Sequence, residues 1–184
     1  MQTVFTDLTS SNEALQEQAA VLLSEAFRER NIPAWPTLDD ARREIKECTD
    51  KKFICIGCVH NNELLGWAGL RPMYEKTWEL HPMVVKPDHQ HKGIGRLLIQ
   101  ELERTAKEHG IAGIVLGSDD ENGETTLSGK DFEKIDLFQE IKKIKNIHHH
   151  PYEFFMKCGY TIVGIIPDSG GFGKPDIWLW KRVK

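Results

Sequence analysis

The sequence predicts one α/β domain built around a mixed sheet. Amphipathic helical segments alternate with short apolar segments along the whole chain. The 184 residues suit one compact domain with a full core. No internal repeat or low-complexity linker divides the chain, so we expect a single domain over residues 1–184.

Two helices are predicted before the first long strand. Ser10 and Glu13 have the spacing of a capping box, and apolar residues follow at helical intervals to residue 26. Thr37 and Asp40 are placed to begin a second helix, whose apolar residues share one face as far as Cys48.

Three strands are expected next. The apolar segments 53–60 and 64–70 flank Asn61-Asn62, which predicts a β-hairpin. Residues 78–85 predict the third strand. Pro82 lies inside it and must interrupt the pairing, because proline has no N–H to donate.

The second half of the chain continues the alternation. The predicted elements are helix 93–109, strand 111–117, helix 132–147, a short helix from Pro151 to Gly159, and strands 160–166 and 176–181. The segment 111–117 is continuously apolar, which is typical of a strand buried on both faces.

Composition excludes several classes of protein. The chain has 24 basic and 28 acidic residues and a net charge of −4, which disfavours tight non-specific binding to nucleic acid. No apolar segment approaches the roughly 20 residues that cross a bilayer. The first ten residues do not resemble a secretory leader, so we expect a cytoplasmic protein with four free thiols and no membrane partner.

The sequence predicts no metal site. Cys55 and Cys58 lie three apart in a predicted strand, so their sulfurs point to opposite faces. His148, His149 and His150 are consecutive and cannot all face one ion, and no neighbouring Cys or carboxylate in the sequence completes a tetrahedral set.

The most informative segment joins strand 78–85 to the helix that follows. A loop containing Gly93 opens the helix, and helix N-termini bind anions through their free N–H groups. Gly93 and Gly95 would let a phosphate approach the backbone, and Lys92 and Arg96 add positive charge. The spacing differs from a nucleotide P-loop and from the dinucleotide fingerprint.

The spacing Gln90-x-x-Gly93-x-Gly95 resembles the coenzyme motif of the GCN5-related N-acetyltransferases (GNAT). A second motif of that superfamily, a short helix that ends in Gly-aromatic before a strand, matches residues 152–163. Within the superfamily, four ordered blocks resemble aminoglycoside 6′-N-acetyltransferases; they are residues 78–85, 116–120, 150–154 and 174–178. The resemblance covers about residues 67–181.

The resemblance implies a GNAT-like mixed central sheet flanked by helices, with its central strands splayed to admit acetyl-CoA. It implies transfer of an acetyl group to the 6′-amine of an aminoglycoside, which confers resistance, by an enzyme that is often a homodimer. The diphosphate would lie on Gln90, His91, Lys92, Gly93, Ile94, Gly95 and Arg96. The pantetheine would run along Met83, Val84 and Val85.

Glu79 and His81 are the candidate catalytic pair. They lie two apart in a strand, so both side chains face the same way and could hold a cationic amine and route its proton. The Met83 N–H could donate to the developing oxyanion. A surface Glu–His pair is the alternative from these residues alone, and the resemblance favours the catalytic role.

The general acid is left open. Related enzymes often place a tyrosine where this chain has Phe155, which cannot donate a proton. Tyr152, one helical turn earlier, could substitute, and both residues are expected near the coenzyme. Water could also assist, because a thiol pKa is only modestly above neutral.

Acidic residues at strand ends suggest the acceptor. Asp119, Asp120 and Asp176 would attract a polycationic aminoglycoside. Trp35 could wall the cleft or be a buried anchor. Two other functions stay open: acetylation of a polyamine, peptide or other small amine, and a non-catalytic module that binds acetyl-CoA or a drug.

Overall fold

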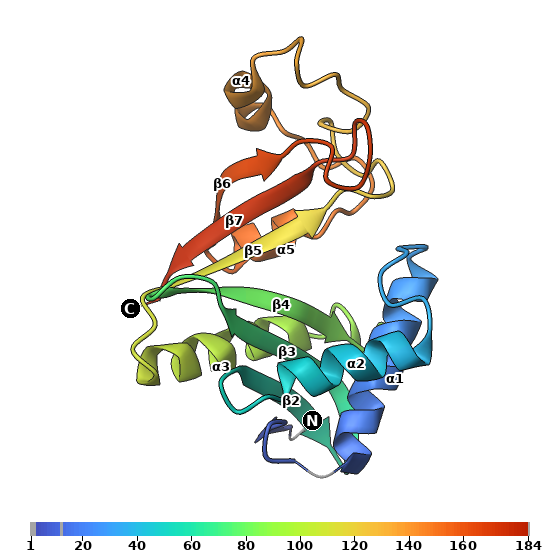
Figure 1. The fold of residues 1–184 in the computed structure, drawn as a ribbon, viewed down its shortest axis with the longest axis vertical. Helices are drawn as coiled ribbons and strands as arrows, with labels where there is room; N and C mark the ends of the chain where they lie inside the picture. Colours follow the sequence, from blue (N-terminus) through green and yellow to red (C-terminus); the bar gives the residue numbers. More distant parts are fainter. Residues whose placement is uncertain (1–2, 12, 184) are drawn as a thin grey trace. The chain divides into compact units, whose positions relative to one another are not determined.

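The computed structural model describes residues 3–11 and 13–183, which form helices and strands in two compact units (Figure 1). The first unit runs to Ile114 and includes Val183 near the C-terminus; the second spans Val115–Arg182. The predicted α/β class is confirmed. The prediction of a single domain stays a prediction. No helix within the two described ranges is long and apolar enough to span a bilayer.

The first unit contains four antiparallel strands in the order β1-β2-β3-β4. Their bounds are β1 (Val4–Asp7), β2 (Ile54–His60), β3 (Glu63–Pro72) and β4 (Thr77–Val85). The predicted hairpin is confirmed, since Asn61 and Asn62 form its turn at φ 49° and 63°. The sequence did not predict β1, whose four residues are too short to show a period.

Pro82 produces the predicted interruption of the sheet. Ala68 pairs with Met83, but Leu70 pairs with Leu80, so His81 and Pro82 together oppose Gly69 as a β-bulge. A Cβ at Gly69 would lie 2.7 Å from the His81 carbonyl oxygen, so this position requires glycine. The peptide bond between His81 and Pro82 is cis.

Helices cover both faces of the four-stranded sheet. They are α1 (Glu13–Glu29), α2 (Leu38–Cys48) and α3 (Ile94–Glu108). Trp67 is fully buried and donates its ring N–H to the Ala19 carbonyl of α1 at 3.1 Å. The next residue toward the N-terminus, Gly66, lies against Leu98 of α3. Because neighbouring strand residues point to opposite faces, α1 and α3 pack on opposite sides of the sheet.

The predicted role of Ser10 as a helix cap is wrong. The first helix begins at Glu13, which places the cap position at residue 12, outside the described residues. The Ser10 hydroxyl instead lies 3.4 Å from the Asp7 carbonyl oxygen. The apolar period located the helix correctly, but the short S-x-x-E pattern misplaced its start.

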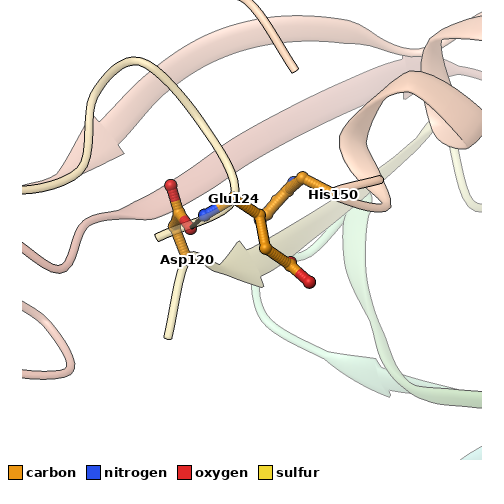
Figure 2. A group of neighbouring side chains, drawn as sticks. All are labelled: Asp120, Glu124 and His150. Carbon is orange, nitrogen blue, oxygen red and sulfur yellow. Dashed lines mark hydrogen bonds between the residues drawn. The ribbon is translucent and has the colours of Figure 1, made fainter. Parts of the chain in front are cut away.

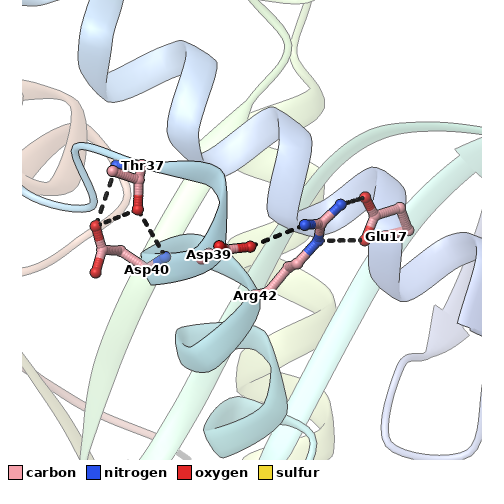
Figure 3. A network of polar contacts seen from close by, with 5 residues as sticks. All are labelled: Glu17, Thr37, Asp39, Asp40 and Arg42. Carbon is pink, nitrogen blue, oxygen red and sulfur yellow. Dashed lines mark hydrogen bonds and ion pairs between the residues drawn. The ribbon is translucent and has the colours of Figure 1, made fainter.

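The predicted start of α2 at Thr37 and Asp40 is confirmed, and the structure shows that the two residues form a capping box (Figure 3). Thr37 Oγ1 accepts the Asp40 N–H at 3.2 Å, and the Asp40 carboxylate accepts the Thr37 N–H at 3.1 Å. Arg42 binds Glu17 of α1 through two hydrogen bonds of 3.0 and 2.6 Å, and also contacts Asp39. Exposed ion pairs add little stability, whereas the box satisfies N–H groups at the helix start and fixes where α2 begins.

The second unit contains three strands in the order β5-β7-β6 and two short helices. Their bounds are β5 (Gly113–Asp119, which starts at the boundary of the units), β6 (Thr161–Ile166), β7 (Asp176–Arg182), α4 (Leu137–Lys142) and α5 (Tyr152–Lys157). Strands β6 and β7 are antiparallel. The predicted short helix and the last two strands are confirmed.

The predicted helix over residues 132–147 is wrong, because only α4 forms. Asp136 caps it by accepting the Gln139 N–H at 3.1 Å, so the helix cannot begin earlier. Beyond α4 the backbone pairs with an earlier loop: Thr126 N–H donates to Lys145 and Ile147 N–H to Glu124. These long-range hydrogen bonds stabilise a non-helical backbone here, although the local apolar pattern favours a helix.

The four cysteines are free thiols, as predicted, and differ in burial. Cys48, Cys55 and Cys58 are buried, and burial raises the pKa of each thiol. Cys158 is half-buried at the end of α5. Because the thiolate is the reactive form, we expect Ellman's reagent to label Cys158 rapidly in the folded protein and all four thiols in denaturant.

The matched variant for this labelling experiment is Cys158→Ser, which should remove the rapid phase entirely. Rapid labelling of two or more thiols in the folded wild-type protein would contradict the burial of the other three. The same variant lowers the protein-thiol background in assays that detect released CoA.

Candidate active site

The loop after β4 is anchored by Gln90. A 3-10 turn (Pro87–His89) follows the strand, and Gln90 then donates its side-chain N–H to the Val85 carbonyl oxygen at 3.1 Å. The backbone N–H of Gln90 donates to Pro87 at 3.2 Å. The side chain therefore ties the loop to the end of the strand, and its own amide is used inside the turn.

Gly93 is the cap residue of α3 and has a left-handed backbone, with φ 91° and ψ −9°. A side chain is disfavoured there by conformation, although no atom lies within 4 Å of the place a Cβ would take. The open space lies directly in front of the helix start. A ligand could thus approach this backbone without meeting a side chain.

The first turn of α3 leaves N–H groups available to that ligand. The first helical hydrogen bond runs from Leu97 N–H to Gly93 at 3.1 Å. In the part of the chain that the structure describes, the N–H groups of Gly95 and Arg96 make no backbone hydrogen bond. With the charges of Lys92 and Arg96, these groups fit a diphosphate at the positive end of the helix.

Glu79 lies on β4 directly opposite Arg71 of β3. Its carboxylate accepts a hydrogen bond from Arg71 Nε at 2.7 Å, and the Glu79 side chain is 14% exposed. Burial works against the Arg71 charge, but the hydrogen bond and charge of Glu79 outweigh it and raise the Arg71 pKa. Glu79 is therefore held in one place by a cross-strand partner.

His81, two residues along the same strand, faces α2. Its Nε2 lies 3.5 Å from Glu44 Oε1, and its ring centroid lies 5.7 Å from that of Trp35. A cavity of about 90 Å³ opens at this place. It is lined by Glu44, Glu47, Cys48, Phe53, Gly69, Leu70, Arg71 and His81.

Sequence reasoning missed both Arg71 and Glu44. Arg71 lies beside Glu79 because the register of β3 and β4 places them opposite each other. Glu44 lies near His81 because α2 packs on the sheet. The short spacing between Glu79 and His81 suggested a pair, but each side chain has a partner on another element. From the sequence alone only one such contact could be expected: Glu44 and Cys48 are four residues apart on a predicted helix and therefore lie on the same side of it.

The acidic residues of the second unit differ in their tasks. Asp119 is exposed at the end of β5, and Asp176 begins β7 with one carboxylate oxygen buried. Asp120 is 1% exposed, and its oxygens accept hydrogen bonds from the backbone of Glu124 and Thr125 and from two hydroxyls, those of Thr125 and Ser128. Asp120 therefore holds its loop together rather than presenting a free carboxylate.

Asp120, Glu124 and His150 come together in the second unit (Figure 2). One ligand atom from each lies within 4.8 Å of the others, so the fold brings two carboxylates to His150 that the sequence did not place there. His150 Nδ1 accepts the Tyr152 N–H at 3.2 Å, and Nε2 lies 3.2 Å from the Asp119 carbonyl oxygen. Both ring nitrogens thus have protein partners, and a metal would have to displace them.

Tyr152 and Phe155 both lie inside the second unit. Phe155 packs edge-on against Phe154 and Tyr160, with ring centroids 5.1 and 6.0 Å away. Tyr152 is 4% exposed, and burial, with the charge of Glu153, raises its pKa. Tyr152 therefore keeps its proton at neutral pH, which a proton donor requires.

The fold and loop define an α/β protein in which the start of α3 fits a diphosphate and β4 carries Glu79 and His81. The profile of the acetyltransferase (GNAT) family matches residues 20–125. The chain belongs to this family, and its expected fold and acetyl-CoA-dependent N-acetyltransferase class are confirmed. The splaying of its central strands stays a prediction.

Solved structures are similar over nearly the whole chain. An aminoglycoside 6′-N-acetyltransferase in complex with coenzyme A is 34% identical, with a TM-score of 0.90 over 98% of this chain and 97% of that one. The aminoglycoside 6′-N-acetyltransferase from Enterococcus faecium is also 34% identical, with a TM-score of 0.89 and the same coverage. A type Ii enzyme is 30% identical, with a TM-score of 0.74 over 100% of this chain and 98% of that one.

Proposed function

We propose that this protein transfers an acetyl group from acetyl-CoA to the 6′-amine of aminoglycoside antibiotics. The observation that carries the proposal is the 34% identity, over 98% of the chain, to enzymes with this activity. The carboxylates of Glu44 and Glu79 in its candidate site support a cationic acceptor. Acetyl-CoA, when bound, supplies an acetyl group activated as a thioester.

The first unit supplies the coenzyme site in this proposal. The amides of Gly95 and Arg96 and the charge of Lys92 hold the diphosphate, and His91, Gly93 and Ile94 shape the loop around it. The backbone of Met83, Val84 and Val85 receives the pantetheine. Gln90 serves by fixing the loop to β4, since its own N–H already donates to Pro87.

Glu79 and His81 carry the acceptor chemistry in this proposal. An ammonium must lose a proton before its nitrogen can attack a thioester. Glu79 attracts the ammonium, and His81 takes its proton directly or through one water. The nitrogen then bonds to the carbonyl carbon and gives its second proton to water as the bond to sulfur breaks. The Met83 N–H donates to the negative charge that develops on the oxygen.

Tyr152 is the proton donor to the departing thiolate in this proposal, in the role that Phe155 cannot fill. A tyrosine side chain is protonated at neutral pH, so the phenol has a proton to give when the thiolate forms. Asp119 and Asp176 supply negative charge for the remaining ammonium groups of the drug. Asp120 keeps the structural task described above. The cytoplasmic location and homodimer stay predictions of the sequence.

A thiol-release assay tests the proposal. Purified Cys158→Ser protein with acetyl-CoA should release CoA rapidly with kanamycin, and slowly or not at all with spermidine or a lysine-containing peptide. Equal or faster release with a polyamine or peptide would change the acceptor and keep the reaction class. Acetyl-CoA binding by calorimetry with no release on any amine would indicate a binding module instead.

A further inference from the structure

Glu44, a residue with no catalytic role so far, sits where three segments of the first unit meet. Its Oε2 accepts the ring N–H of Trp35 at 3.0 Å, and its Oε1 accepts the thiol S–H of Cys48 at 3.3 Å. The same Oε1 lies 3.5 Å from His81 Nε2. The Glu44 side chain is only 15% exposed, so its charge acts on its neighbours with little screening.

The groups that hold Glu44 are themselves fixed. Trp35 packs edge-on against Phe27 at 4.7 Å and keeps a φ of 50°, a conformation that costs energy for a non-glycine residue. The raised pKa of the buried Cys48 thiol keeps its proton available for donation. Cys48 also lies 3.7 Å from the His81 carbonyl oxygen, which joins α2 to the bulge.

These contacts determine how the His81 ring can be used. Its Nε2 lies 3.5 Å from the Glu44 carboxylate and its ring lies near Trp35, which favours the neutral tautomer with its proton on Nε2. That tautomer leaves the lone pair on Nδ1. The His81 side chain is 29% exposed, which allows a substrate or a water to reach the ring.

We propose that Glu44 is the positioning residue of His81: it holds the ring with Nδ1 as proton acceptor and stabilises the imidazolium that forms. The inference rests on the proposed function and deepens it. A proton leaves the substrate ammonium and bonds to Nδ1, the charge of the imidazolium is balanced by Glu44, and the proton then passes to water. No other reactant is required.

The other charged groups around His81 do not replace Glu44. Arg71 of β3 and Glu79 of β4 pair with each other. Glu47 of α2 lines the same cavity but is exposed. The Cys48 thiol is neutral. Arg71 also interacts with the charge of Glu44, which helps to keep that carboxylate in place beside the ring.

The test is the titration of the His81 ring by NMR, with its signal assigned from His81→Ala. An opposite charge within about 4–6 Å favours the charged form, so Glu44→Gln should lower the titration midpoint by about one pH unit. Glu47→Gln is the matched control, because it removes a carboxylate from the same helix and cavity. Its midpoint should equal that of the wild type.

The kinetic readout separates positioning from folding. Glu44→Gln should lower kcat with kanamycin about tenfold and move the pH profile of kcat in the same direction as the NMR midpoint, with an unchanged affinity for CoA. If Glu44→Gln folds poorly, Glu44→Asp is the second variant. It keeps the negative charge but moves the carboxylate away from the His81 ring by the length of one methylene. It should then show a lowered midpoint.

An unchanged His81 midpoint in folded Glu44→Gln, or in Glu44→Asp if only that variant folds, would overturn the inference. The titration requires no turnover. If the protein acetylates no amine and the midpoint still falls, the proposed function fails and the coupling of Glu44 to His81 stands. If turnover is normal and the midpoint does not move, the function stands and Glu44 has no such role.

Discussion

Gly93→Asp is expected to abolish coenzyme binding. Gly93 caps α3 with an open space before it, and an aspartate would put a carboxylate beside the proposed diphosphate. Two like charges about 4 Å apart repel by about 4 kcal/mol at an effective dielectric constant near 20. Such a penalty weakens binding about 1,000-fold, which calorimetry with CoA would register as loss of detectable heat.

Gly93→Asn is the matched control for this substitution. Asparagine has nearly the same shape as aspartate and tolerates a left-handed backbone, but it carries no charge. We expect it to keep CoA binding within about tenfold of the wild type. Equal loss in both variants would assign the effect to the backbone, and undiminished affinity in Gly93→Asp would remove this loop from the coenzyme site.

His81→Ala and Glu79→Gln are expected to lower kcat/KM for kanamycin while CoA affinity stays nearly unchanged. Proton transfer by a positioned side chain contributes typically about 10²–10⁴-fold to rate, so we expect at least a 100-fold loss for His81→Ala. Steady-state kinetics and calorimetry on the same preparations measure the two quantities. Parallel losses of turnover and CoA affinity would show that the pair is structural.

Arg71→Met is the control for Glu79, because the two side chains are bonded across the strands. If Glu79 serves the acceptor, this variant keeps the carboxylate and should retain most of the activity. If Glu79 only neutralises Arg71, the two variants should lose activity to the same extent, and the proposed contact of Glu79 with the substrate would be abandoned.

Local signals predicted local structure well. The Asn61-Asn62 turn, the helix start at Thr37 and the glycine at the start of α3 each act through the nearest few residues, and each is found where the sequence placed it. Pro82 likewise produced its bulge, because a missing N–H must interrupt a ladder whatever the tertiary context.

Features that depend on long-range contacts could not be predicted. The helix expected over residues 132–147 does not form as predicted, because residues at its C-terminal end make backbone hydrogen bonds with residues 124–126. A local apolar pattern cannot indicate such contacts. Asp120 looked like a ligand-binding loop carboxylate, but backbone amides and two hydroxyls from its own loop surround it. The partners of Glu79 and His81 depend on strand register and helix docking in the same way.

One comparison tests the assignment most directly. Neomycin and paromomycin differ only at the 6′ position, where the first carries an amine and the second a hydroxyl. With acetyl-CoA and this protein, we predict that mass spectrometry finds neomycin gaining a single acetyl group while paromomycin stays unmodified. Acetylation of both drugs to the same extent, or of neither, would contradict transfer to the 6′-amine.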